Sequence, residues 1–157
     1  MATQYTAGLS AGQILTAATM NQIGAAWETW TPALTASTTN PTLGTGSSQT
    51  GRYGRVNKFV YGQGQISFGT SGVAAGSGFY YTSLPVTAQS SGLLVGTFQI
   101  YDSSATASYF GFLVSDTTSR CLLYYNNPAS VVTNAIPFAG GWAASDFIRV
   151  EFYYEAA

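Results

Sequence analysis

The sequence contains no histidine, and only 7% of its 157 residues are charged, whereas an ordinary soluble domain carries about 25%. Without histidine, a serine or cysteine nucleophile lacks the general base that usually activates it. The segment Gly8–Gly12 (GLSAG) matches the G-x-S-x-G pattern of many hydrolases, but no histidine can activate Ser10. We therefore expect no catalytic residue in this segment.

Cysteine and metal-binding patterns are equally scarce. Cys121 is the single cysteine, which excludes an intrachain disulfide. Because it begins an apolar run, we expect its thiol to be buried and inert. With no histidine and no D-x-D-x-D-G loop, the sequence predicts neither a metal site nor a cofactor.

Positive charge and long apolar runs are also missing. The formal net charge is −1, and only Arg52, Arg55 and Lys58 cluster among the five cations, which is too few to follow a phosphate backbone. No apolar stretch is long enough to span a bilayer. The first residues have neither the basic start nor the apolar block of a secretory signal. We expect no nucleic acid, no membrane insertion and synthesis in a reducing cytoplasm.

The carboxylates are the remaining candidates for acid–base chemistry. Glycoside cleavage needs two carboxyl groups about 5–9.5 Å apart, and Asp102 and Asp116 could face each other across a loop end. Both lie in Ser- and Thr-rich turns, where aspartate usually caps backbone amides. The structural role is therefore favoured, and no hydrolytic activity is expected. The six carboxylates are Glu28, Asp102, Asp116, Asp146, Glu151 and Glu155.

The dominant pattern in the chain is that of short β-strands. Residues 59–68 alternate cleanly, with Gly62 and Gly64 on the apolar face, where they predict close approach of a ring or backbone. In the last strand Arg149 and Glu151 mark a solvent side, and Asn57 suits a tight turn with positive φ. Residues 36–50 and 69–78 are expected to be loops. The predicted strands cover 53–56, 59–68, 79–84, 93–101, 108–114, 120–125, 131–138 and 147–154, with further β character at 31–35.

The N-terminal part has a different pattern. Residues 1–15 are expected to form an extended arm, and a helix is predicted over Thr16–Trp27 with Thr16 as its N-cap. Met20, Ile23 and Trp27 form one apolar stripe about two turns long. Because so short a helix is marginal alone, its stripe predicts packing in a symmetric oligomer. The expected organisation is an attachment and oligomerisation segment at 1–29 and a β-sandwich domain at 30–157.

Aromatic residues make up 15% of the chain. Trp27 and Trp30 are expected to form a hydrophobic plug at the helix–strand junction. In an alternating strand, one member of each tyrosine doublet should face away from the core. Exposed tyrosines suit either sugar binding or a subunit interface, and the interface is the favoured alternative. The doublets are Tyr80-Tyr81, Tyr124-Tyr125 and Tyr153-Tyr154.

Four motifs occur in an order that carries a resemblance. They are Gln13–Asn21 (QILTAATMN), Trp27–Pro32 (WETWTP), Gly51–Lys58 (GRYGRVNK) and Ser83–Val86 (SLPV). This order resembles the small β-rich domains of tailed-phage virion proteins, which include minor tail proteins, tail fibres and head fibres. The resemblance covers the chain from about Gln13 onward, and its motifs are structural.

The resemblance implies a non-enzymatic virion structural protein that displays a β-domain on the particle surface. The fold expected is all-β, an antiparallel β-sandwich of jelly-roll type preceded by a short N-terminal arm and helix. The Gln13–Asn21 segment favours a tail location, with a capsid-decoration or head-fibre protein as the alternative and a carbohydrate-binding module or depolymerase less favoured. The implied partners are the chain itself as a homotrimer, other virion proteins of tail or capsid, and a host receptor or surface glycan. The expected oligomer and attachment residues are Met20, Ile23, Trp27 and Trp30.

Overall fold

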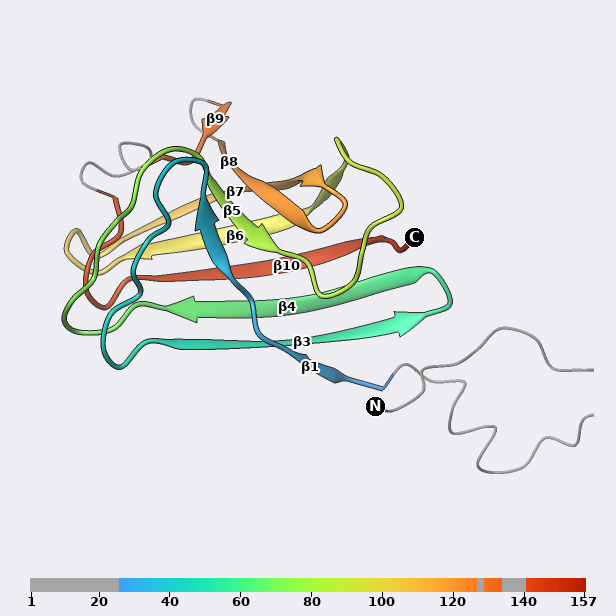
Figure 1. Cartoon of the computed structure of the whole chain (residues 1–157), viewed down its shortest axis with the longest axis horizontal. Helices are drawn as coiled ribbons and strands as arrows, with labels where there is room; N and C mark the ends of the chain where they lie inside the picture. The colour runs from blue at the N-terminus through green and yellow to red at the C-terminus, as the bar shows by residue number, and fades with distance from the viewer. Residues whose placement is uncertain (1–25, 127–128, 134–140) are drawn as a thin grey trace, which may run out of the picture.

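The computed structural model describes residues 26–126, 129–133 and 141–157. All regular structure in this part of the chain is β (Figure 1), so the predicted all-β class is confirmed. The helix predicted over Thr16–Trp27, with Met20 and Ile23, lies outside the described residues except for Ala26 and Trp27. These two residues are not helical, and the helix is not confirmed.

Ten strands follow one another along the described chain. They are β1 (Glu28–Trp30), β2 (Leu34–Ala36), β3 (Ser48–Val56), β4 (Phe59–Ser67), β5 (Tyr80–Ser83), β6 (Leu94–Asp102), β7 (Ala107–Thr117), β8 (Arg120–Asn126), β9 (Ala129–Val131) and β10 (Phe147–Glu155).

The strands form one continuous antiparallel sheet in the order β1-β3-β4-β10-β6-β7-β8-β5-β2, with β9 added beside β8. The sheet curls, so that β5 and β2 cross over the inner face of β4, β10 and β6 (Figure 1). The predicted division into two sheets of jelly-roll type is not confirmed, because each strand is hydrogen-bonded to its neighbour along the whole path. The antiparallel pairing itself is as predicted.

The first two strands join the two ends of this sheet. Strand β1 pairs with β3, whereas β2, which begins after only residues 31–33, pairs with β5 at the opposite end. Pro32 interrupts the run because it has no N–H for a ladder; it is fully buried, and its carbonyl accepts a hydrogen bond of 2.9 Å from Gln49 Nε2. Of the β run predicted at 31–35, only Leu34 and Thr35 lie in a strand, β2, and a bend at Pro32 separates this strand from β1.

The core fills the concave inner face of the curled sheet. In β10 the side chains of Ile148, Val150, Phe152 and Tyr154 are buried, and the alternate side chains from Arg149 onward are exposed. Trp30 lies edge-on to Phe152 with ring centroids 5.3 Å apart. The other core members include Leu34, Val60, Ile66, Phe68, Tyr80, Val95, Phe98, Ile100, Leu113, Leu123, Val132 and Trp142.

Glycines on the inner face allow these rings to reach the sheet. A Cβ at Gly62 would lie 2.6 Å from the Phe152 ring, and a Cβ at Gly64 would lie 2.7 Å from the Trp30 ring. The close approach predicted for this glycine pair is confirmed. The β3–β4 turn also matches its prediction, because Asn57 has a φ of 56°.

Two segments expected to be loops are paired. Residues 48–50 belong to β3 and follow the register of β4. Residues 37–46 run antiparallel to residues 69–79 through isolated bridges, which are Thr39↔Ser77, Thr42↔Ala74 and Thr45↔Ser71. Both segments are rich in Ser, Thr and Gly. They therefore lack the alternation of hydrophobic and polar residues by which a strand is predicted from sequence.

Candidate functional site

The solvent-facing side of β3, β4, β10, β6 and β7, which we call the outer face, carries two rows of side chains in register. One row crosses the five strands as Arg52, Gln63, Glu151, Thr97 and Phe112. The next row crosses them as Thr50, Gln65, Arg149, Gln99 and Phe110. Each row therefore changes from polar at β3 to aromatic at β7.

Amide side chains hold the two arginines of the outer face. Arg149 Nε donates to Gln65 Oε1 at 2.8 Å, and its guanidinium lies 4.5 Å from the centre of the Phe147 ring. Arg52 donates twice at 3.1 Å to Gln63 when the amide oxygen of Gln63 faces it. Among the described residues no hydrogen bond or ion pair engages the side-chain carboxylate of Glu151. The Glu151 carboxylate and the remaining N–H groups of the Arg149 guanidinium can therefore bind a partner from solvent.

Two grooves lie on either side of β10 on this face. The first, of about 480 Å³, is lined by Thr29, Thr50, Arg52, Gln63, Gln65, Arg149 and Glu151 together with backbone of β3, β4 and β10. The second, of about 460 Å³, is lined by Thr97, Phe98, Gln99, Phe110, Gly111, Phe112, Arg149 and Glu151. Arg149 and Glu151 form the ridge that the two grooves share.

Large hydrophobic side chains are exposed mainly on the outer face. Of the nine in the described residues, all except Phe79 lie on this face or at its rim. Phe110 is 59% exposed and Phe112 is 39% exposed. The eight are Trp27, Val56, Phe59, Leu93, Leu94, Phe110, Phe112 and Tyr153. Of these, Leu94, Phe110 and Phe112 line adjoining hollows, and contiguous apolar surface usually marks a binding site.

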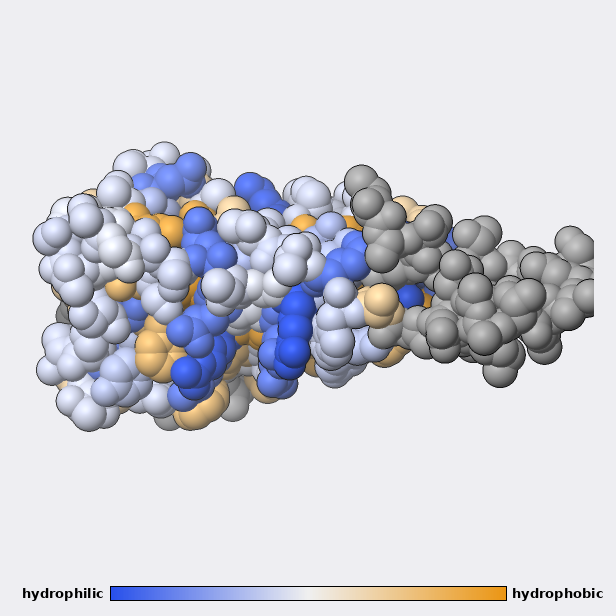
Figure 2. Space-filling model, turned by 90° about the horizontal axis from the view of Figure 1, so that it is seen from below, coloured by the Kyte–Doolittle hydropathy of each residue, from blue (hydrophilic) through white to orange (hydrophobic). Residues whose placement is uncertain are grey.

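The view from the β1 and β3 side shows a different kind of surface. There most residues are pale, hydrophilic residues gather in a few blue clusters, and hydrophobic residues form small orange patches (Figure 2). The pale colour marks residues of intermediate hydropathy, such as serine, threonine and glycine.

The tyrosine doublets follow the alternation rule only in part. Tyr153 is 56% exposed while Tyr154 is buried, as predicted. Tyr80 belongs to the core cluster and Tyr81 does not, so the two alternate, but Tyr81 is buried as well and the exposure expected of it is not found. The reason is that β5 lies inside the curl, and the guanidinium of Arg120 covers the Tyr81 ring at 4.0 Å. Tyr124 and Tyr125 are both half-buried.

The structure does not bring the four predicted oligomer and attachment residues together as far as it describes them. Trp27 is on the outer face, edge-on to Tyr61 at 5.3 Å and beneath the Arg52 guanidinium at 4.6 Å. Trp30 points to the inner face and packs on Phe152. The two tryptophans therefore do not form one plug, because odd and even residues of an extended strand face opposite ways. Met20 and Ile23 lie outside the described residues.

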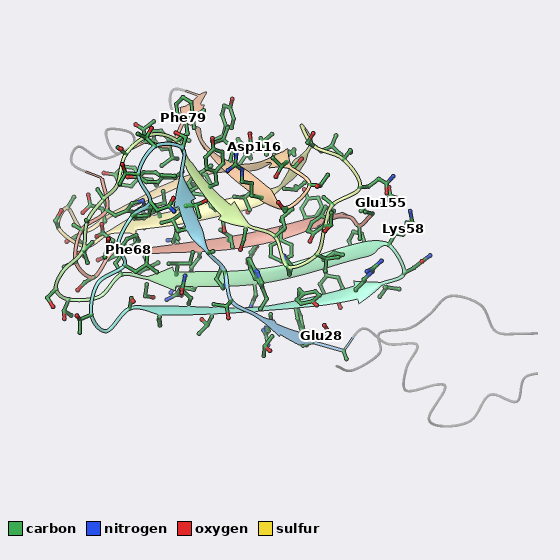
Figure 3. All side chains as sticks on the ribbon, in the orientation of Figure 1. Glu28, Lys58, Phe68, Phe79, Asp116 and Glu155 are labelled. Carbon is green, nitrogen blue, oxygen red and sulfur yellow. The ribbon has the colours of Figure 1, made fainter. Side chains whose placement is uncertain are left out.

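The candidate acid pair is not assembled either. Asp102 pairs with Ala107 at the start of β7, and Asp116 lies nine residues further along that strand, about 30 Å away. Asp116 accepts a 2.7 Å hydrogen bond from Arg120 Nε. Glu28, Asp116 and Glu155 lie on separate elements (Figure 3). The suggestion that Asp102 and Asp116 face each other is wrong.

Asp102 and Asp146 are buried and cap loops. Asp102 Oδ1 accepts hydrogen bonds from the Ser104 hydroxyl and from the amides of Ser104 and Ala105, at 2.6 to 3.0 Å. These bonds, that of the Ser104 hydroxyl first, lower the pKa of Asp102. Asp146 accepts from the Ser103 amide at 2.9 Å and from the Ala143 amide at 2.8 Å. The capping role expected of Asp102 is thus found, whereas Asp116 lies in β7 and bonds the Arg120 side chain instead; Asp146 is a further capping residue.

Cys121 is fully buried in the core. Burial, together with the nearby Asp116 charge, raises the pKa of its thiol to about 12, so the group is inert, as expected from the sequence. Within the described residues no group of three or more Asp, Glu or Cys side chains could hold a metal ion. In the same part of the chain no helix is long and apolar enough to cross a membrane.

Comparison of the chain with protein-family models, with curated proteins and with solved structures finds no match in any of the three. The candidate site therefore stands on its geometry. Only part of the outer face could be predicted from the sequence: the alternation gives Arg149 and Glu151 a solvent side, but no sequence pattern distinguishes the exposed Phe110 and Phe112 from core residues.

Proposed function

We propose that the chain is a non-enzymatic structural protein of a tailed-phage virion, which displays its β-domain on the particle surface. The four sequence motifs support this setting. The observation that carries the binding part of the proposal is the outer face, where exposed aromatic rings flank a ridge of Arg149 and Glu151. A face of this composition functions by contact with a partner.

The expected location is the tail, as a fibre or minor tail protein, and the segment of residues 1–29 is the proposed attachment part. Host receptor or surface glycan is the external partner that the resemblance implies for the β-domain; it is not assigned to the outer face. A capsid-decoration or head-fibre protein is the second candidate, because the same β-domain would serve there equally well. Saccharide cleavage is not proposed, since Asp102 and Asp146 are engaged as loop caps and Asp116 pairs with Arg120.

Gold-labelled antibodies against the purified protein test this proposal on intact particles from cells that carry the gene. Label at the tail is expected. Label over the head would favour the capsid-decoration alternative. Absence of label from purified particles, with the protein present in the same lysate, would overturn the virion assignment.

A further inference from the structure

The outer face carries both exposed apolar surface and two opposite charges without a mutual pair. We infer that this face is a self-association surface, on which a second copy of the chain binds with Arg149 of one copy against Glu151 of the other. The inference rests on the proposed function only in that a virion structural protein assembles from many copies. Its evidence is the geometry of β10 and of the strands beside it.

The exposed apolar side chains of the outer face adjoin one another and do not lie singly among polar residues. Leu94, Phe112, Val114 and Tyr124 surround an open hollow of about 400 Å³. Phe110 and Phe112 continue this surface into the groove beside β10. Monomeric proteins rarely leave a contiguous patch of this kind in water, and a second protein surface would remove it from solvent.

The charged part of the face is self-complementary. Arg149 and Glu151 are exposed on the same side of β10, two residues and about 6.6 Å apart. The Arg149 Nε–H is held by Gln65, and no other hydrogen bond of this guanidinium lies within the described part of the chain. A closed symmetric assembly lets every copy give one arginine and receive one, so that all the charges are paired.

The two opposite charges of the outer face also favour one kind of partner, a second copy of the chain. A strongly acidic partner would place like charge against Glu151, and a strongly basic partner would place like charge against Arg149. A copy of the same chain avoids both, and its net charge of −1 adds little repulsion. A saccharide could use the amides and the arginines of the grooves, but it would leave the hollow beside Leu94 and Val114 uncovered.

The test is the mass of the full-length protein by sedimentation velocity, from low to tens of micromolar. We expect the wild type to be an oligomer. Arg149→Glu and Glu151→Arg each place like charges together, so each should weaken association at least tenfold. The double variant Arg149→Glu/Glu151→Arg restores the pairing with reversed polarity and should recover most of the wild-type association.

Lys58→Glu is the matched control, because it changes the net charge as much as Arg149→Glu but lies in the β3–β4 turn, at the end of the sheet (Figure 3). It should associate like the wild type. Circular dichroism establishes that each variant keeps its β signal. A wild type that stays monomeric overturns the inference, as does an oligomer unaffected by either single change. Failure of the double variant to recover overturns the pairing. None of these results depends on where antibodies label particles.

Discussion

At the scale of single residues, Gly64 shows how the ring of Trp30 fits against the sheet. A Cβ added at Gly64 would lie 2.7 Å from Trp30 Cζ3, so the ring must shift. We expect Gly64→Ala to lower the free energy of unfolding by roughly 1–3 kcal/mol, the usual cost of overpacking a core. Urea unfolding followed by fluorescence measures this loss.

A double-mutant cycle identifies the cause. In a Trp30→Ala background the space beside Gly64 is open, so the alanine should cost much less there than in the wild type. An equal cost in both backgrounds would show that the backbone of β4, and not the indole ring, excludes the methyl group.

The titratable residues predict a free energy of unfolding that changes little from about pH 5 to 9. No histidine is present, and the groups whose pKa values are shifted titrate outside that range. The lowered pKa of Asp102 gives stability that is present at neutral pH and is lost as pH falls below about 4. Burial raises the pKa of Cys121 and of Tyr80 to about 12. The stability that these two groups contribute is complete at pH values below their pKa values in the unfolded chain, about 8.5 for cysteine and 10 for tyrosine. It is lost as the pH rises toward 12.

Urea unfolding at a series of pH values measures this profile. Cys121→Ala should remove the part of the alkaline loss that begins near pH 9 and should leave the acid side unchanged. A melting temperature that moves by many degrees between pH 6 and 8 would contradict the prediction and point to a proton linked to assembly.

At the scale of elements, protection from hydrogen exchange should follow position in the sheet. Strand β10 has hydrogen-bonded neighbours on both sides, β4 and β6, over most of its length. The three-residue strands β1, β2 and β9 lie at the ends of the pairing path or off it. We expect mass spectrometry to find the slowest exchange in β10 and fast exchange in β9 and β1. Faster exchange in β10 than in β1 would contradict this order.

Elements with strict alternation are the ones that could be predicted from the sequence. Residues 59–68 and 147–154 agree with β4 and β10 to within a residue, because one face of each strand is apolar and the other is not. Residues 48–52 and 37–46 could not be predicted, since their pairing depends on partners distant in the chain. The polar ridge of the site followed from the alternation at Arg149 and Glu151. The exposure of Phe110 and Phe112 could not be predicted. Hydrophobicity alone does not indicate which face of a curled sheet remains exposed to solvent.

At the scale of the whole molecule, the described β-domain should be independent of the first 25 residues. Among the residues that the structure describes, every member of the buried core lies between Leu34 and Ala156. We expect a chain that begins at Ala26 to keep the β signal and to melt within a few degrees of the full-length protein, as measured by circular dichroism. An unfolded truncation would show that the removed residues complete the core.

A shorter deletion tests attachment separately. Removal of residues 2–12 should leave the β-domain folded and oligomeric but no longer joined to particles, because the arm is the proposed docking segment. Incorporation at the wild-type copy number would place attachment on the sheet. Quantitative immunoblotting of purified particles gives the answer.

The central place of β10 has a consequence for synthesis. Strands β4 and β6 both bond to β10 and not to each other, yet β10 is synthesised after the other nine strands of the described chain. Until then the nascent chain consists of a β3–β4 hairpin and a β6–β7–β8 meander, each with an unpaired edge. Such edges are templates for pairing with the wrong chain. Strand β10 thus joins the two parts of the sheet. Premature termination before Phe147 should therefore yield aggregates rather than a smaller folded domain.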